Sequence, residues 1–308
     1  MQATGGVDKD AMTDVVPRLE FTILGCGSSG GVPRVGGDWG ACDPANPRNR
    51  RRRCSLLVRR IGAHGETTVL VDTGADMREQ LLDAGVTALD AVLYTHAHAD
   101  HIHGIDDLRA LALTHRHRID VYMDEPTSHR MHEAFGYCFS TPPGSNYPPI
   151  LTEHRLRPLQ PVTICGAGGD LVVLPFLQNH GEIDSLGFRF GGLAYSSDVN
   201  DLPDESLEPL ADLDLWIVDA LRDTPHVSHF SVADALHWIE RVKPRRAVLT
   251  DLHVDLDYAE LAARLPAGVE PAYDGQRFVL GVEGHHATGH ITTLEAERLR
   301  QSASQQQQ

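Results

Sequence analysis

Cysteine and positive charge are both scarce in this chain of 308 residues. Its five cysteines are few and odd in number, which excludes a disulfide framework and indicates a reducing compartment. Lysine and arginine number 27 against 43 aspartates and glutamates, so the formal net charge is −16. Such a surface repels nucleic acid and anionic membranes unless positive charge is concentrated locally. We therefore expect a cytoplasmic protein with a small-molecule partner, no membrane partner and no preference for nucleic acid.

Long apolar runs and a phosphate-binding loop are also missing. No run approaches the roughly 18 apolar residues that span a bilayer, and residues 1–17 lack the apolar core of a signal peptide. The glycine-rich run 25–31 is not followed by the Gly-Lys-Ser/Thr of a P-loop. The one local excess of positive charge, Arg48 with Arg50–Arg53, is interpreted as a solvated loop with surface ion pairs.

The strongest motif is Tyr94-Thr-His96-Ala-His98-Ala-Asp100-His101, directly after an apolar strand predicted at 89–95. In extended chain, residues i, i+2 and i+4 face one side, so His96, His98 and Asp100 converge. His101 then points elsewhere unless the chain turns. This pattern suits two adjacent metal ions, and imidazole with carboxylate favours zinc or manganese.

The rest of the chain alternates strands and helices in two β-rich halves. Each half has to cover one sheet face with helices and pack its other face on the second sheet, which predicts an α/β fold, a four-layer αββα sandwich. We expect a disordered segment at 1–18, one domain at 19–283 and a polar tail at 284–308. The Pro-rich stretch 136–150 is predicted to be irregular, either a lid or a contact in a homodimer.

Several predicted strands end in a single potential ligand. Strand ends at one edge of a sandwich are where a site assembles. Asp72 ends an early strand and is a candidate to support a ligand histidine from behind. The later strand-end residues are His180, Asp198, Asp219 and His253.

These motifs resemble those of the metallo-β-lactamase superfamily of hydrolases. Within it the chain is most similar to the phosphoribosyl 1,2-cyclic phosphate phosphodiesterases and their uncharacterised bacterial relatives, over about residues 19–282. The resemblance is carried by Gly25-Cys-Gly-Ser-Ser-Gly-Gly-Val-Pro-Arg34, the loop 94–104, Asp184-Ser-Leu-Gly-Phe188, Tyr195-Ser-Ser-Asp198 and His226-x-x-His229.

The resemblance implies a ligand set for two metal ions. His96, His98 and His180 would hold the first, Asp100, His101 and His253 the second, and Asp198 would bridge them. An aspartate bridge, in place of the cysteine of many β-lactamases, implies phosphodiester or thioester hydrolysis. Relatives often have histidine where this chain has Asp251, so Asp251 is an alternative to His253 as the last ligand.

The same resemblance implies roles around the metals. Two ions activate water for attack on phosphorus. The catalytic residues would be Asp100, also a ligand, and His229, which would protonate the leaving oxygen. Related enzymes hold a structural zinc on three cysteines, of which only Cys42 remains here, so no third zinc is expected. Candidates that support ligands or bind substrate are Asp72, Ser28, Arg34, Arg222 and His226.

Three alternatives stay open at this point. A tRNA 3′-processing endonuclease of the same superfamily needs an arm and a basic surface, which this chain lacks. A lactone or thioester hydrolase is disfavoured only by the family resemblance. A di-iron redox protein is a different class, but that branch usually carries glutamate where this chain has His98.

Overall fold

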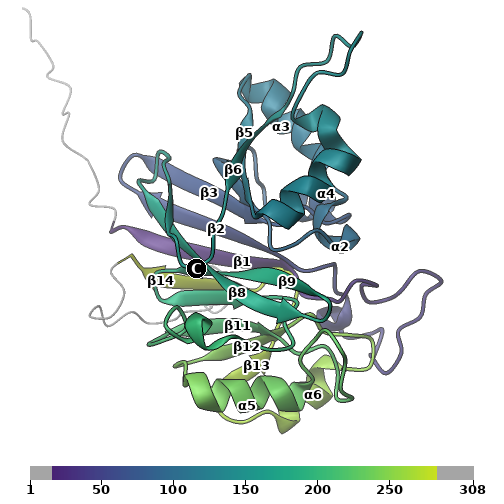
Figure 1. Ribbon diagram of the computed structural model, residues 1–308. Helices are drawn as coiled ribbons and strands as arrows, with labels where there is room; N and C mark the ends of the chain where they lie inside the picture. Colours follow the sequence, from purple (N-terminus) through teal and green to yellow (C-terminus); the bar gives the residue numbers. More distant parts are fainter. Residues whose placement is uncertain (1–15, 283–308) are drawn as a thin grey trace, which may run out of the picture.

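Two seven-stranded sheets lie face to face in the computed structural model, which describes residues 16–282 (Figure 1). In the first sheet the strand order is β14-β1-β2-β3-β4-β5-β6. The pairs from β14 to β3 are antiparallel and those from β3 to β6 are parallel. Its strands are β1 (Arg18–Gly25), β2 (Ser55–Gly62), β3 (Gly65–Val71), β4 (Ala91–Leu93), β5 (Ile119–Met123), β6 (Leu151–Arg155) and β14 (Arg277–Gly281).

The second sheet has the order β13-β12-β11-β10-β9-β8-β7. Here β10 to β13 are parallel and β7 to β10 antiparallel. Its strands are β7 (Val162–Ile164), β8 (Leu171–His180), β9 (Ile183–Phe190), β10 (Leu193–Ser196), β11 (Leu215–Asp219), β12 (Ala247–Thr250) and β13 (Val269–Pro271).

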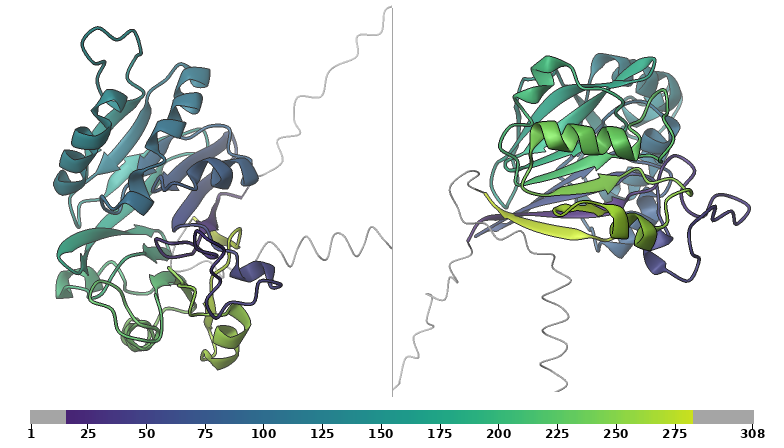
Figure 2. Two further views of the ribbon diagram at one scale, coloured as in Figure 1. Left: turned by 90° about the vertical axis from the view of Figure 1, so that its right-hand side faces the viewer. Right: turned by 90° about the horizontal axis from the view of Figure 1, so that it is seen from below.

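Helices cover the outer face of each sheet, which completes the predicted four-layer sandwich. Figure 2 shows α5 lying across the second sheet. The α-helices are α1 (Met77–Asp83), α2 (Ala99–Ile102), α3 (Leu108–His115), α4 (Glu125–Phe135), α5 (Val232–Val242) and α6 (Tyr258–Arg264). Short 3-10 turns are η1 (Pro47–Asn49), η2 (Ile105–Asp107), η3 (Gly136–Cys138) and η4 (Asp204–Leu207).

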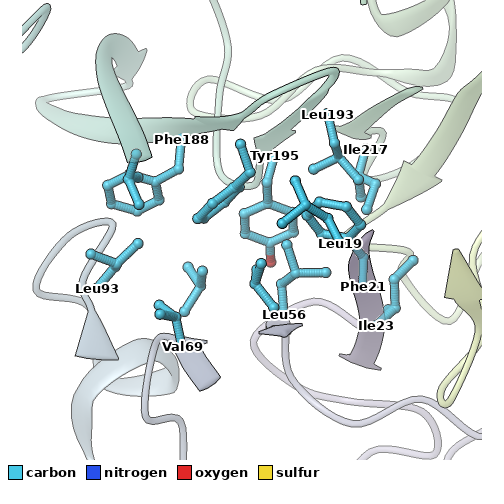
Figure 3. Packing of buried hydrophobic residues seen from close by; sticks show 14 of the residues in the cluster. Leu19, Phe21, Ile23, Leu56, Val69, Leu93, Phe188, Leu193, Tyr195 and Ile217 are labelled. Atoms are coloured by element: carbon cyan, nitrogen blue, oxygen red, sulfur yellow. The ribbon is translucent and has the colours of Figure 1, made fainter. Parts of the chain in front are cut away.

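Successive side chains of a buried strand point to opposite faces of the sheet, and both faces are covered. This explains why the sequences of these strands are continuous apolar runs. In β1, Phe21 and Ile23 face the space between the sheets, whereas Leu24 packs under the helices of the first sheet. Strand β11 does the same, since Ile217 faces inward and Trp216 faces α5. A strand buried on both faces needs apolar side chains at every position. Figure 3 shows side chains of the two sheets pointing toward one another in this central core.

The sequence missed some elements and placed others to within a few residues. The short edge strands β6 and β7 were not expected, because β6 (Leu-Thr-Glu-His-Arg) has little apolar content. The capping box predicted at Ser231 and Asp234 is present and starts α5. The stretch 136–150 begins with η3 and is otherwise without helix or strand, as expected, while its role as a lid or dimer contact stays a prediction.

The predicted terminal segments lie almost entirely outside the described residues, so their disorder stays untested. The predicted boundary at residue 18 is the first residue of β1. No helix within residues 16–282 has the length and apolarity needed to cross a bilayer.

Candidate active site and metal centre

One edge of the sandwich gathers the polar side chains that follow successive strands. His96 and His98 come after β4, and the chain then turns into the short helix α2. The sequence left open whether His101 points away from the other ligands. This turn brings both Asp100 and His101 back toward the strand end. From the second half come the last residue of β8, His180, and the residues just after or at the end of β10, β11 and β12, which are Asp198, Asp219 and Asp251.

The first group of potential metal ligands is formed by His96, His98, His180 and Asp198, whose ligand atoms lie within 4.8 Å of one another. Nε2 of His96 lies 3.7 Å, and Nε2 of His180 3.5 Å, from Oδ2 of Asp198. Nδ1 of His98 lies 3.2 Å from Nε2 of His180. Three imidazoles and a carboxylate from both halves of the chain therefore converge on one point.

Asp100, His101 and Asp198 form the second group. Nε2 of His101 lies 3.1 Å from Oδ1 of Asp198 and 3.5 Å from Oδ2 of Asp100. Asp198 thus presents one carboxylate oxygen to each group. The family resemblance implied this bridging position for Asp198.

Hydrogen bonds behind the histidines fix which ring nitrogen faces the cluster. Nδ1 of His101 donates to Asp72 at 2.8 Å, and Nδ1 of His180 donates to the carbonyl of Ser228 at 2.6 Å. Nδ1 of His96 lies 3.0 Å from Oγ1 of Thr95, which itself donates to Asp72. Each of these three rings therefore keeps Nε2 for a ligand, as in metal sites whose histidines are oriented by a hydrogen bond to the other nitrogen.

His229 brings a third group into contact with the same centre, together with Asp198 and Asp251. Its Nδ1 lies 2.8 Å from Oδ2 of Asp219 and 2.9 Å from Oδ2 of Asp251, while its Nε2 is 4.0 Å from Asp198. Burial alone would lower the pKa of His229, but Asp219 and Asp251 raise it to about 12. The ring is therefore held in place by two buried carboxylates.

The residues present fit divalent metal ions. Nε2 of His96 is buried and has no hydrogen-bond partner, although the ring is surrounded by polar side chains. Burial and the neighbouring His101 lower the pKa of His96, and burial lowers the pKa of His180 to about 4, so both favour the neutral, metal-binding form. Burial opposes ionisation of Asp198, yet His101 and His96 hold its pKa well below its usual range.

Three of the aspartates at this edge have a left-handed backbone. Asp72, Asp198 and Asp251 have φ angles of 64°, 52° and 63°. This region is uncommon for residues other than glycine, although aspartate tolerates it better than most. Each of the three directly follows, or lies two residues beyond, the end of a strand, so the sharp turn there aims the carboxylate into the site.

His253, expected from the sequence to complete the second group, lies outside all three groups. Its Nδ1 is 2.8 Å from Oδ2 of Asp255, and its Nε2 contacts the guanidinium of Arg34. The assignment of His253 as a ligand is therefore corrected. The left-handed turn after β12 points Asp251 into the centre and places His253, two residues on, beside Arg34.

The remaining predicted residues lie at different distances from the centre. The His226 ring is 5.2 Å from that of His229. Arg34 and Arg222 lie close enough to His253 to lower the pKa of its ring, beyond the effect of burial, and His253 in turn contributes to the lowered pKa of His226. Ser28 is buried in the loop after β1, where its neighbour Gly27 bridges to Leu252.

Sequence reasoning missed two functional positions. Asp219 was noted only as a strand-end residue, and its contact with His229 depends on the path of the loop between β11 and α5, which periodicity does not reveal. Thr95 was treated as part of a strand, but it ties His96 to Asp72. In both cases the detectable signal was the position at a strand end.

The chain belongs to the beta-lactamase superfamily, since the model for the beta-lactamase superfamily domain matches residues 67–251. It thus has the metallo-β-lactamase fold, which confirms the resemblance seen in the sequence. Within the superfamily it is close to the PhnP family. The crystal structure of "a New Diphosphatase from the PhnP Family" is 34% identical, with a TM-score of 0.76 over 85% of this chain and 97% of that one.

Two curated proteins are also similar. An octanoyltransferase of Porphyromonas gingivalis is 33% identical over 86% of this chain and 52% of its own length. A ribonuclease Z of a Bradyrhizobium species is 34% identical over 47% of this chain and 46% of its own length. The chain spans about half the length of each of these curated relatives.

Proposed function

We propose that the protein hydrolyses a small phosphodiester, with a cyclic phosphodiester such as phosphoribosyl 1,2-cyclic phosphate as the specific candidate. The observation that carries this proposal is the position of Asp198, whose two oxygens face two separate ligand groups. Two divalent ions, zinc or manganese, would be held by these groups, one with His96, His98 and His180, the other with Asp100 and His101, and Asp251 nearby.

Metal ions in such a pair supply Lewis acidity and lower the pKa of water at the site. The chain's own residues supply positioning and proton transfer. Nδ1 of His229 donates to Asp219 and Asp251, and these carboxylates raise the pKa of the ring against the effect of burial, so Nε2 also holds a proton, on the side of Asp198. That proton can pass to the leaving oxygen. Arg34 and Arg222 provide positive charge near the centre for the phosphate, whereas burial and the neighbouring His229 lower the pKa of His226 and favour its neutral ring.

A diphosphate is the second candidate, favoured by the 34% identical diphosphatase of the PhnP family. In a nucleoside diphosphate the α-phosphorus has two bridging oxygens, as the phosphorus of a phosphodiester has. The five cysteines are all free thiols, which supports our proposal that the enzyme acts in the reducing cytoplasm.

The test is a substrate panel with the metal-loaded enzyme. Phosphoribosyl 1,2-cyclic phosphate, a nucleoside diphosphate and bis(4-nitrophenyl) phosphate would be compared with a precursor tRNA, a lactone and an octanoyl thioester. We expect kcat/KM for one of the phosphorus substrates to exceed that for the lactone and the thioester by orders of magnitude. Selective turnover of the tRNA would indicate a nuclease, and selective turnover of the lactone or thioester would overturn the proposal.

A further inference from the structure

A cavity of about 550 Å³ opens directly beside the ligand cluster. His96 and Ala97 form its inner end, so the cavity adjoins the first ligand group. The first turn of α4 and the segment 155–158 after β6 line one side, and the β8–β9 hairpin lines the other. This volume lies in the range of sites that enclose whole organic ligands, and a phosphate group alone would leave most of it empty.

The walls of this cavity are mainly apolar. They are formed by Pro126, Leu156, Pro158, Leu177 and Ile183, which come from four separate segments. An organic ring placed between these walls would be removed from water, which stabilises binding by about 25 cal/mol for each Å² of apolar surface buried.

The polar groups of the cavity carry both signs of charge. Asp124 is already used to cap α4, where it accepts from the backbone of Thr127 at 3.0 Å. Arg155 is held by Glu153 at 3.1 Å. Glu125, Asp184 and Arg157 complete the lining. Three carboxylates against two guanidinium groups disfavour a polyanion, but they offer acceptors for hydroxyl groups and a planar guanidinium that can stack on a ring.

We propose that this cavity binds the organic group attached to the substrate phosphate, and that it selects an uncharged, hydroxylated, ring-containing group of nucleoside size. The inference rests on the proposed phosphodiester hydrolysis and narrows its substrate class to diesters without a second phosphate, which disfavours phosphoribosyl 1,2-cyclic phosphate itself. The phosphate lies at the ligand cluster beyond His96, the ring lies between Ile183 and Pro158, and the carboxylates of Glu125 and Asp184 accept from the sugar hydroxyls.

The experiment compares two esters that release the same 4-nitrophenolate. Thymidine 5′-(4-nitrophenyl) phosphate carries a nucleoside, whereas methyl 4-nitrophenyl phosphate carries one carbon. We expect kcat/KM of the wild type to favour the thymidine ester by roughly tenfold or more, as burial of a ring in a shaped pocket allows. Ile183→Trp should fill the cavity and remove this preference, and Arg157→Ala, on an exposed residue, should reduce it.

Val172→Trp is the matched control, because Val172 is 54% exposed on β8 and Ile183 is 39% exposed on β9 of the same hairpin. It should leave the preference unchanged. Since Ile183 pairs with His180 across the hairpin, the metal content of Ile183→Trp has to equal that of the wild type. Equal kcat/KM for the two esters in the wild type, or equal losses for both in Ile183→Trp and Arg157→Ala, would overturn the inference while leaving the hydrolase intact.

Calorimetric titration of metal-free protein with thymidine 5′-monophosphate and with inorganic phosphate separates the cavity from the chemistry. We expect the nucleotide to bind more tightly than phosphate, and Ile183→Trp to abolish the difference. If neither ester is hydrolysed, the proposed function fails, but this titration still decides the inference. Nucleotide binding no tighter than that of phosphate would refute it.

Discussion

Nδ1 of His101 donates to Oδ2 of Asp72 at 2.8 Å, and both side chains are fully buried. Asp72 also accepts from the backbone and the hydroxyl of Thr95. One carboxylate at the end of β3 thereby orients the second ligand group and, through Thr95, the ring of His96 in the first. The two groups share a support as well as the carboxylate of Asp198.

Asp72→Asn keeps the shape of this support and removes its charge. We expect metal affinity to fall by roughly 10- to 100-fold, the usual cost of losing such a partner behind a ligand histidine. Competition with a chromogenic chelator measures it. Asp90→Asn is the control, because Asp90 likewise accepts a backbone N–H, that of Thr68, but lies away from the cluster. Similar affinities for both variants would contradict the support role.

Asp198→Ala should lower the occupancy of both metal sites, since among residues 16–282 only Asp198 belongs to both groups. Elemental analysis of protein purified without chelator should approach two divalent ions per chain in the wild type. The variant should lose ions from both sites. A wild type that retains one ion or none after reconstitution with zinc and manganese would exclude the two-metal centre.

His229→Ala tests proton transfer to the leaving group. Esters with a poor leaving group should slow by roughly 10²- to 10⁴-fold, the usual contribution of acid–base catalysis. A 4-nitrophenyl ester needs little protonation and should slow far less, and the metal content should stay at the wild-type value. Equal slowing of both substrates, or a lost ion, would make His229 a ligand or a binding residue instead.

Cys42→Ser should leave metal content and folding nearly unchanged. The Cys42 thiol donates toward the carbonyls of Val254 and Leu256 at 3.3 Å, and the buried guanidinium of Arg51 lies beside it. A hydroxyl can make the same hydrogen bonds. Elemental analysis and thermal unfolding check this prediction, and loss of a tightly held ion would reveal a structural metal site at this loop.

Asp274 should make stability depend on pH in a defined direction. Burial raises its pKa to about 6, although the neighbouring Arg52 lowers it. Because this value exceeds the roughly 3.9 of an unfolded aspartate, the stability that Asp274 contributes is complete below pH 4 and declines as pH rises through 6. Asp274→Asn lacks this titration.

The free energy of unfolding of the wild type minus that of Asp274→Asn should therefore fall between pH 4.5 and pH 7.5. The decrease should be about 2 kcal/mol, since roughly 1.5 pKa units of the shift lie above pH 4.5 and one unit corresponds to about 1.4 kcal/mol. Urea unfolding of the metal-free proteins at both pH values measures it. A difference that stays constant, or one that grows with pH, would show that Asp274 is not protonated in the folded protein at low pH.

The parts of the site that lie within one segment were predictable from the sequence. The loop 94–101 follows a strand of apolar residues, and its spacing alone suggested two metals. His180 and Asp198 came from the strand-end rule together with the family resemblance. Both inferences use motifs and strand ends that can be recognised along the sequence.

The choice between Asp251 and His253 was not predictable in the same way. Both follow β12, and only the left-handed φ of Asp251 decides which side chain turns inward. Aspartate adopts that conformation more readily than most residues, but sequence offers no means to know that the chain needs it there. The contact of Asp219 with His229 depends likewise on how the loop between β11 and α5 folds back on the end of β11.

Three of the seven non-glycine residues with positive φ in the range 16–282 are Asp72, Asp198 and Asp251. A non-glycine residue held in such a conformation costs of order 1–3 kcal/mol, which the surrounding sandwich has to offset. Glycine at any of the three would relieve the backbone and erase the chemistry in the same step. Substitutions chosen for thermal stability alone would therefore drive this edge toward inactivity, so durability and catalysis make opposite demands on the same three residues.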